Sequence, residues 1–156
     1  MNWPVMVPFE IDGRLHLYYG AIPGLHGDIY SQTPHLYFPQ GGVLCRASWD
    51  MGRFYALVNA RGGGLPHAYV TTKPTKITGK TLQINAATLS GGEVLAELLD
   101  DQRSPIPGFA EADCRPFRGD EKFAAISWRG GSVPARDVVR IRFYISSAKL
   151  YGYAWS

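Results

Sequence analysis

The stretch Val138-Val-Arg-Ile-Arg-Phe-Tyr-Ile-Ser146 alternates between apolar and polar side chains from its second residue onward. Successive side chains of a β-strand point to opposite faces, so this stretch predicts a strand with one apolar and one polar face. The apolar face would carry Val139, Ile141, Phe143 and Ile145. The polar face would carry Arg140, Arg142 and Tyr144.

Segments of the same kind recur toward both ends of the chain, about ten residues apart, with Gly-, Pro-, Asp- or Ser-containing turns between them. The predicted strands are His67–Thr72, Thr81–Ala86, Glu93–Leu99, Phe123–Trp128, Val138–Ser146 and Lys149–Trp155. The chain of 156 residues also holds 18 Gly and 11 Pro, and 46% of its residues are hydrophobic. These features predict an all-β fold, an antiparallel β-sandwich of jelly-roll type.

The N-terminal part is expected to differ from the rest. Asp12-Gly13 between Phe9–Ile11 and Arg14–Gly20 is a strong hairpin signal. We therefore expect residues 1–42 to form a short hairpin followed by an aromatic loop, and residues 43–156 to form the sandwich. The two further strands expected early in the sandwich are Val43–Ser48 and Phe54–Asn59. Helix is expected in two short pieces, Ala110–Cys114 and Pro134–Asp137.

Composition limits the partners. The net charge is +3 and the basic residues form no run of five, so no nucleic-acid partner is expected. No window of 18 apolar residues is present, so no membrane span is expected. The N-terminus carries two prolines and no basic region, so no signal peptide is predicted and localisation stays open. Cys45 and Cys114 would form either one disulfide or two buried free thiols.

The polar face offers candidate ligand contacts. Across the predicted strands it would gather Asn85, Glu93, Glu97, Arg140, Arg142 and Tyr144. This set is either a ligand-facing surface or a lattice of Glu–Arg pairs. Sugar binding also needs aromatic platforms, for which Trp49, Tyr30 and Tyr37 are candidates, with His35, Asn85 and Arg142 as hydrogen-bonding partners.

Acidic residues suggest two further kinds of site. A glycosidase needs two carboxylates roughly 5–10 Å apart, and the candidate pairs combine Glu97 with Glu111, Asp113 or Asp120. Asp100, Asp113 and Asp120 are candidate ligands of a calcium ion, with solvated acidic loops as the alternative. The loop from Ser104 to Cys114 is expected to be structural, shaped by Pro105, Pro107 and Gly108.

Several segments occur in an order that resembles a known family. They include Gly13-Arg-Leu-His-Leu-Tyr-Tyr-Gly20, Pro105-Ile-Pro-Gly-Phe109, Ala112-Asp-Cys114, Trp128-Arg-Gly-Gly131 and Ala148-Lys-Leu-Tyr151. Together they resemble the C-terminal end of the family 32/43-type five-bladed β-propeller glycoside hydrolases. The resemblance implies that residues 52–155 match the family's C-terminal β-sandwich and residues 9–26 the end of its last propeller blade. The family's catalytic carboxylates lie on earlier blades that this sequence does not contain, so none is carried over.

The resemblance implies a carbohydrate-associated β-sandwich module that binds glycans or supports their processing, with an oligo- or polysaccharide as partner. A small stand-alone glycoside hydrolase and a structural remnant without ligand are the alternatives. Relatives in the family are often secreted. Without its propeller neighbours, the strand Arg14–Gly20 would have a free edge, so we expect the chain itself or a second copy in a homo-oligomer to cover it.

Overall fold

The computed structural model describes residues 2–4, 7–21, 43–59 and 68–156. Within them the chain forms two compact units, Met1–Phe54 and Tyr55–Ser156. We call them the N-terminal unit and the sandwich unit and describe each by itself. Among the described residues, no helix is long and apolar enough to cross a membrane.

The N-terminal unit is an antiparallel sheet built around β3 (Arg14–Ala21). One side of β3 pairs along its whole length with β4 (Val43–Asp50). The other side pairs with β1 (Asn2–Pro4) and β2 (Phe9–Ile11). Asp12 and Gly13 connect β2 to β3 with φ of 51° and 71°, the conformation that a two-residue hairpin turn requires. The predicted hairpin is confirmed.

The pairing of β4 changes the expected division of the chain. Residues 43–50 were assigned to the sandwich, but their hydrogen-bonding partner is β3, and the two units divide after Phe54. The same pairing gives β3 a neighbour on both sides. The edge of β3 that was expected to be free is therefore covered within the chain. A free edge of this strand no longer gives a reason to expect self-association.

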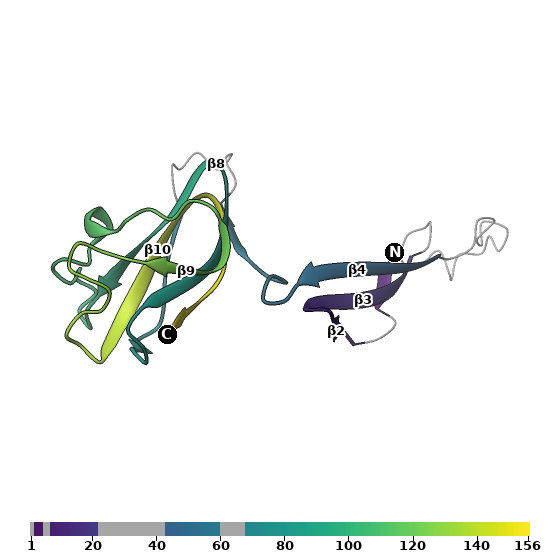
Figure 1. Ribbon diagram of the computed structural model, residues 1–156, viewed down its shortest axis with the longest axis horizontal. Helices are drawn as coiled ribbons and strands as arrows, with labels where there is room; N and C mark the ends of the chain where they lie inside the picture. The colour runs from purple at the N-terminus through teal and green to yellow at the C-terminus, as the bar shows by residue number, and fades with distance from the viewer. Residues whose placement is uncertain (1, 5–6, 22–42, 60–67) are drawn as a thin grey trace, which may run out of the picture. The chain divides into compact units, whose positions relative to one another are not determined.

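The sandwich unit is dominated by two long strands, β8 (Leu82–Leu99) and β10 (Val138–Trp155), which run antiparallel side by side (Figure 1). The free side of β8 pairs with β9 (Asp120–Ile126). The free side of β10 pairs with β5 (Leu57–Asn59), β6 (Ala68–Thr71) and β7 (Thr75–Lys76). A 3₁₀ helix, η3 (Glu111–Asp113), lies within the predicted helical piece Ala110–Cys114. Residues 134–137 contain no helix, so that prediction was wrong.

The two long strands correct a sequence interpretation. Ser90-Gly-Gly92 and Ser146-Ser147 were expected to be turns that separate four short strands. Instead the ladder is continuous, and its register shifts between Ser146 and Ala148, so that residues 89–92 lie opposite Ser147 in a bulge. Gly91 and Ser147 both have positive φ, 70° and 43°. A Cβ on Gly92 would lie 2.1 Å from the carbonyl oxygen of Ser147, so only glycine fits.

One hydrophobic core is shared by both halves of the long strands. From β8 it takes Leu82, Ile84, Ala86, Val94, Ala96 and Leu98, and from β10 it takes Val139, Ile141, Phe143, Ile145, Ala148 and Leu150. The alternation read from the sequence therefore identified the buried face of β10 correctly. Because both halves of each strand face the same core, the unit is an antiparallel β-sandwich, and the predicted all-β class is confirmed.

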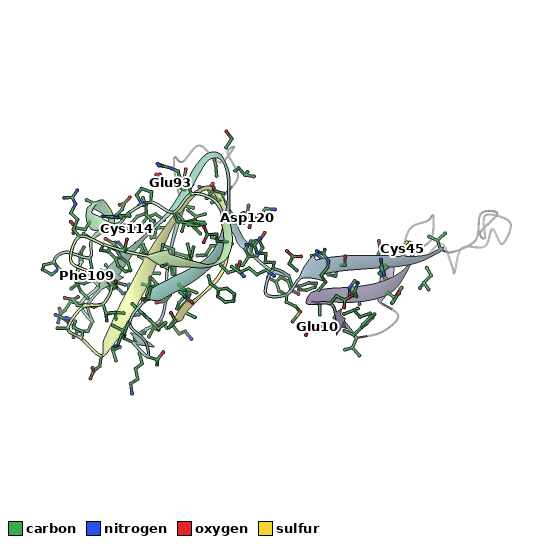
Figure 2. All side chains as sticks on the ribbon, in the orientation of Figure 1. Glu10, Cys45, Glu93, Phe109, Cys114 and Asp120 are labelled. Carbon is green, nitrogen blue, oxygen red and sulfur yellow. The ribbon has the colours of Figure 1, made fainter. Side chains whose placement is uncertain are left out.

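The loop from Ser104 to Cys114 extends the sheet beyond β8. The amide of Ile106 donates to the carbonyl of Leu98 at 2.9 Å, and the amide of Leu98 donates to the carbonyl of Phe109 at 2.9 Å. The ring of Phe109 is buried against the indole of Trp128, with centroids 5.7 Å apart. Figure 2 labels Phe109 and Cys114 on this part of the sandwich unit. The loop has the structural role that its prolines and glycine predicted.

Candidate functional site

The polar face of β8 and β10 carries an ion pair between Glu97 and Arg142. The two residues are directly opposite in the ladder, and Nη1 of Arg142 lies 2.8 Å from Oε1 of Glu97. Glu97 is only 3% exposed. Of the two expectations for this face, a ligand-facing surface or a lattice of Glu–Arg pairs, Glu97 and Arg142 match the lattice. Arg118 and Glu93 form a second pair of the same kind, 2.5 Å apart and much more exposed.

The carboxylate of Glu97 accepts hydrogen bonds at both oxygens. The hydroxyl of Tyr144 donates to Oε1 at 2.8 Å, and the backbone amide of Glu111 donates to Oε2 at 3.4 Å. Burial raises the pKa of the Tyr144 phenol, and its hydrogen bond to Glu97 and the charges of Glu97 and Glu111 raise it further, against the opposing effect of Arg142. Glu97 therefore anchors the side chains of Arg142 and Tyr144.

An aromatic ring lies beside this pair. Tyr69 of β6 is opposite Tyr144 in the ladder, and their ring centroids are 6.2 Å apart. The guanidinium carbon of Arg142 lies 5.3 Å from the centroid of the Tyr69 ring, a cation–π contact. Nε of Arg142 also donates to Oγ1 of Thr71 at 3.1 Å. These contacts fix Arg142, while Tyr69 keeps 67% of its surface exposed.

These side chains open onto a cavity of about 410 Å³, which we call the Tyr69 pocket. Its lining residues come from β6, the segment after it, the turn after β8, and β10. They are Tyr69, Thr71, Thr72, Lys73, Arg103, Arg140 and Arg142. The pocket thus combines one tyrosine ring, two threonine hydroxyls and four cationic side chains. Arg142 is buttressed by the ion pair and held by the Thr71 bond, so it is preorganised to donate hydrogen bonds.

Two further cavities are formed by described residues of the sandwich unit. One of about 360 Å³ has mainly apolar walls, including Phe143 and Leu150, with Tyr55, Tyr151 and Tyr153 also lining it. The other, of about 300 Å³, shares Arg140 with the Tyr69 pocket and is lined on its other parts by Asp100, Asp101 and Arg136. Neither combines an exposed aromatic ring with a fixed cation as the Tyr69 pocket does.

The candidate catalytic residues include Glu97, Glu111 and Asp113, and the structure gives a direct contact between Glu97 and Glu111. η3 contacts β8, and Glu111 reaches Glu97 through its backbone amide. The carboxylate of Asp113 instead accepts from the amide of Ala110 at 3.3 Å, within its own turn. Glu97 is occupied by Arg142 and Tyr144. A catalytic role for the pair stays a prediction.

The candidate calcium ligands do not form a cluster. Asp100 lies at the end of β8, where Oδ1 accepts from the amide of Ser104 at 2.9 Å. Asp113 lies in η3, and Asp120 begins β9 opposite Ala87. Within the described ranges, no three His, Cys, Asp or Glu residues come together as a metal site. The three candidate ligands therefore do not share one site, and a calcium ion stays a prediction.

The candidate sugar contacts are also scattered. Trp49 lies in β4 of the N-terminal unit, packed edge-on against Phe54 with centroids 4.8 Å apart. Asn85 lies in the other half of β8, opposite Gly152. Tyr30, His35 and Tyr37 lie outside the described residues. Among the six candidates, Arg142 is the one that lines the Tyr69 pocket.

Sequence reasoning missed most of the pocket. Tyr69 lies in a strand that was predicted, but nothing in the sequence pairs that strand with the stretch containing Arg142 and Tyr144. Arg103 lies in a turn and has a positive φ of 64°. The one usable signal was that Arg140 and Arg142 share a polar face, which predicts a cationic strip but not its aromatic neighbour.

Cys114 has a structural environment. Cys45 and Cys114 are both free, so the disulfide alternative is not formed. Sγ of Cys114 is buried and accepts the amide of Ala96 at 3.3 Å. Burial raises the pKa of the Cys114 thiol to about 11, against a lowering by the Ala96 hydrogen bond. The thiol is therefore un-ionised at neutral pH and unsuited to nucleophilic chemistry.

Comparison with known proteins adds no relative. The chain matches no family model, no curated protein and no solved structure.

Proposed function

We propose that the sandwich unit is a carbohydrate-binding module, related to the C-terminal β-sandwich of family 32/43-type glycoside hydrolases, and that it binds glycans in the Tyr69 pocket. The observation that carries this proposal is the exposed ring of Tyr69 beside the fixed guanidinium of Arg142. The sequence motifs that resemble that family also support carbohydrate binding.

The pocket has the chemistry that sugars require. A pyranose ring offers a face of C–H groups that packs on an aromatic ring, and an edge of hydroxyls that accept and donate hydrogen bonds. Tyr69 provides the surface for the face, and Thr71, Thr72 and Arg142 provide partners for the edge. A cavity of about 410 Å³ lies within the usual range of small-molecule sites, roughly 300–1,000 Å³.

The test is retardation of the purified chain in native gels containing soluble polysaccharides, followed by calorimetric titration with the matching oligosaccharides. We expect Tyr69→Ala to weaken binding about tenfold or more, which corresponds to ~1.4 kcal/mol. Phe123→Ala is the matched control, because Phe123 is an aromatic residue of β9, 75% exposed, that does not line the pocket. Equal binding by both variants, or no retardation by any polysaccharide, would contradict the proposal.

A small stand-alone hydrolase is the second candidate, because Glu97 and Glu111 both lie close enough to Tyr144 to raise its pKa. Release of nitrophenol from a panel of nitrophenyl glycosides tests it. Turnover that Glu97→Gln or Asp113→Asn abolishes would replace the binding-only function with catalysis. Neither turnover nor binding would leave the structural remnant as the remaining alternative.

A further inference from the structure

The Tyr69 pocket has more positive charge than its own structure uses. Four cationic side chains line it, from Lys73, Arg103, Arg140 and Arg142. Arg142 is neutralised by Glu97 at 2.8 Å. Within the described part of the chain, no carboxylate lies within the ion-pair distance of 4.0 Å of the other three.

The described residues satisfy the side chain of Arg140 only in part. Its Nη1 donates to the backbone oxygen of Thr72 at 3.4 Å, a long hydrogen bond. Its Nε is buried and has no hydrogen-bond partner among the described residues. A buried donor without a partner costs about 1–3 kcal/mol, so the described residues satisfy the Arg140 guanidinium less completely than that of Arg142.

Nearby acidic groups do not remove this excess. Asp100 and Asp101 line the neighbouring cavity beside Arg140 and Arg136. The carboxylate of Asp100 is engaged by the amide of Ser104 at 2.9 Å. Arg103 and Lys73 line the Tyr69 pocket, and none of the lining residues of this pocket is acidic.

We infer that the ligand of the Tyr69 pocket is an anionic glycan, whose sugar rings carry carboxylate or sulfate groups. This inference rests on the proposed function and names its substrate class. The Tyr69 ring packs against a sugar face, and the acidic substituent accepts hydrogen bonds from Arg140 and Arg103. Guanidinium groups bind carboxylate and sulfate oxygens in pairs, with shorter and stronger hydrogen bonds than neutral hydroxyls allow.

The experiment is calorimetric titration of the full chain with three oligosaccharide classes of matched length: a uronate oligomer, a sulfated galactan oligomer and a neutral glucan oligomer. We expect one or both acidic classes to bind at least tenfold more tightly than the neutral one, and the preferred acid identifies the substituent. Affinity for the acidic ligand should fall when sodium chloride rises from about 0.05 to about 0.5 M, because salt screens the interaction.

Variants distinguish binding in the Tyr69 pocket from nonspecific attraction by the net positive charge of the chain. Arg140→Gln and Arg103→Gln should each weaken binding of the acidic ligand tenfold or more. Arg115→Gln is the matched control, since it removes the same charge from an exposed residue that does not line the pocket, and it should change affinity less than twofold. Arg103 is exposed and does not belong to the core cluster, so its variant tests the inference even if Arg140→Gln unfolds.

The outcomes distinguish the two proposals. Equal, salt-insensitive binding of the neutral oligomer that Tyr69→Ala abolishes would overturn the anionic ligand and leave the proposed function standing. Equal loss of binding in the Arg115→Gln control would mean ion exchange by net charge, and it would also overturn the inference. Failure of all three classes to bind would overturn both.

Discussion

The backbone amide of Gly130 donates a hydrogen bond to the carbonyl oxygen of Gly108 at 2.9 Å. The bond joins the Pro105–Phe109 loop to the turn after Trp128, two segments that the sequence singles out. A Cβ on Gly130 would lie 2.7 Å from that carbonyl oxygen and 3.0 Å from the Gly108 Cα. Both positions therefore need glycine, Gly108 also because of its φ of 83°.

We predict that Gly130→Ala destabilises the sandwich unit by roughly 1–3 kcal/mol, because the added methyl group would separate the two backbones. The measurement is urea unfolding followed by tryptophan fluorescence. Gly152→Ala is the control: no atom lies within 4 Å of its Cβ position and its φ is not positive. The control should change stability by less than about 0.5 kcal/mol. Comparable losses in both variants would contradict the close approach as the cause.

The indole groups of the buried Trp128 and the partly buried Trp155 differ in their hydrogen bonding. Nε1 of Trp128 donates to the carbonyl oxygen of Ala96 at 2.6 Å, whereas the buried Nε1 of Trp155 has no partner among the described residues. We expect Trp128→Phe to cost about 1–3 kcal/mol more than Trp155→Phe in the free energy of unfolding, because only the first leaves a buried acceptor unpaired. Thermal unfolding by circular dichroism of both variants checks the order. The reverse order would refute it.

The two Glu–Arg pairs should also differ. Glu97→Gln leaves the partly buried Arg142 without its counter-charge, and we expect a loss of about 1–3 kcal/mol. Glu93→Gln breaks the pair with Arg118, whose side chain is 64% exposed, and should cost roughly 0–1 kcal/mol. Chemical unfolding at low salt gives both values. Equal losses would mean that burial does not distinguish the pairs.

We expect the buried thiol of Cys114 to lower the free energy of unfolding at alkaline pH. Its thiol pKa is raised from 9.0 to about 11 in the folded chain, so between these values the unfolded state has released a proton that the folded state keeps. The unfolded state then binds fewer protons, and the free energy of unfolding falls as the pH rises through this window. We expect the slope to be smaller in Cys114→Ala, measured by urea unfolding at pH 8, 9.5 and 10.5. An unchanged slope would show that Cys114 is not its source.

The sequence predicts elements whose cause is local. The alternation from Val139 to Ile145 identifies the buried face of β10, because a strand has a period of two. Asp12-Gly13 predicts the first hairpin, because both residues tolerate positive φ. The glycines at 91 and 92 were misinterpreted, since a bulge and a turn use the same residues, and only the strand opposite distinguishes them.

The candidate site depends on pairings that no local pattern contains. Tyr69 and Tyr144 are neighbours only because β6 pairs with β10 in one particular register. The sequence correctly predicted that Arg142 lies on a polar face. It did not predict that Glu97, opposite in the ladder, would be buried in an ion pair with Arg142. It also assigned residues 43–50 to the wrong unit, because a strand pattern does not say which strand it pairs with.

The ladder between β8 and β10 has a consequence for how the sandwich unit forms. Paired residues are distant in sequence, and Glu97 and Arg142 are 45 positions apart. Closing such loops costs chain entropy before the contacts compensate for it, which slows folding. Both strands contribute to one shared core along their length, so the core is incomplete until both are present. During synthesis, the ladder must therefore wait until Val138–Trp155 has left the ribosome, and a chain stopped before that strand would expose β8 unpaired on that side.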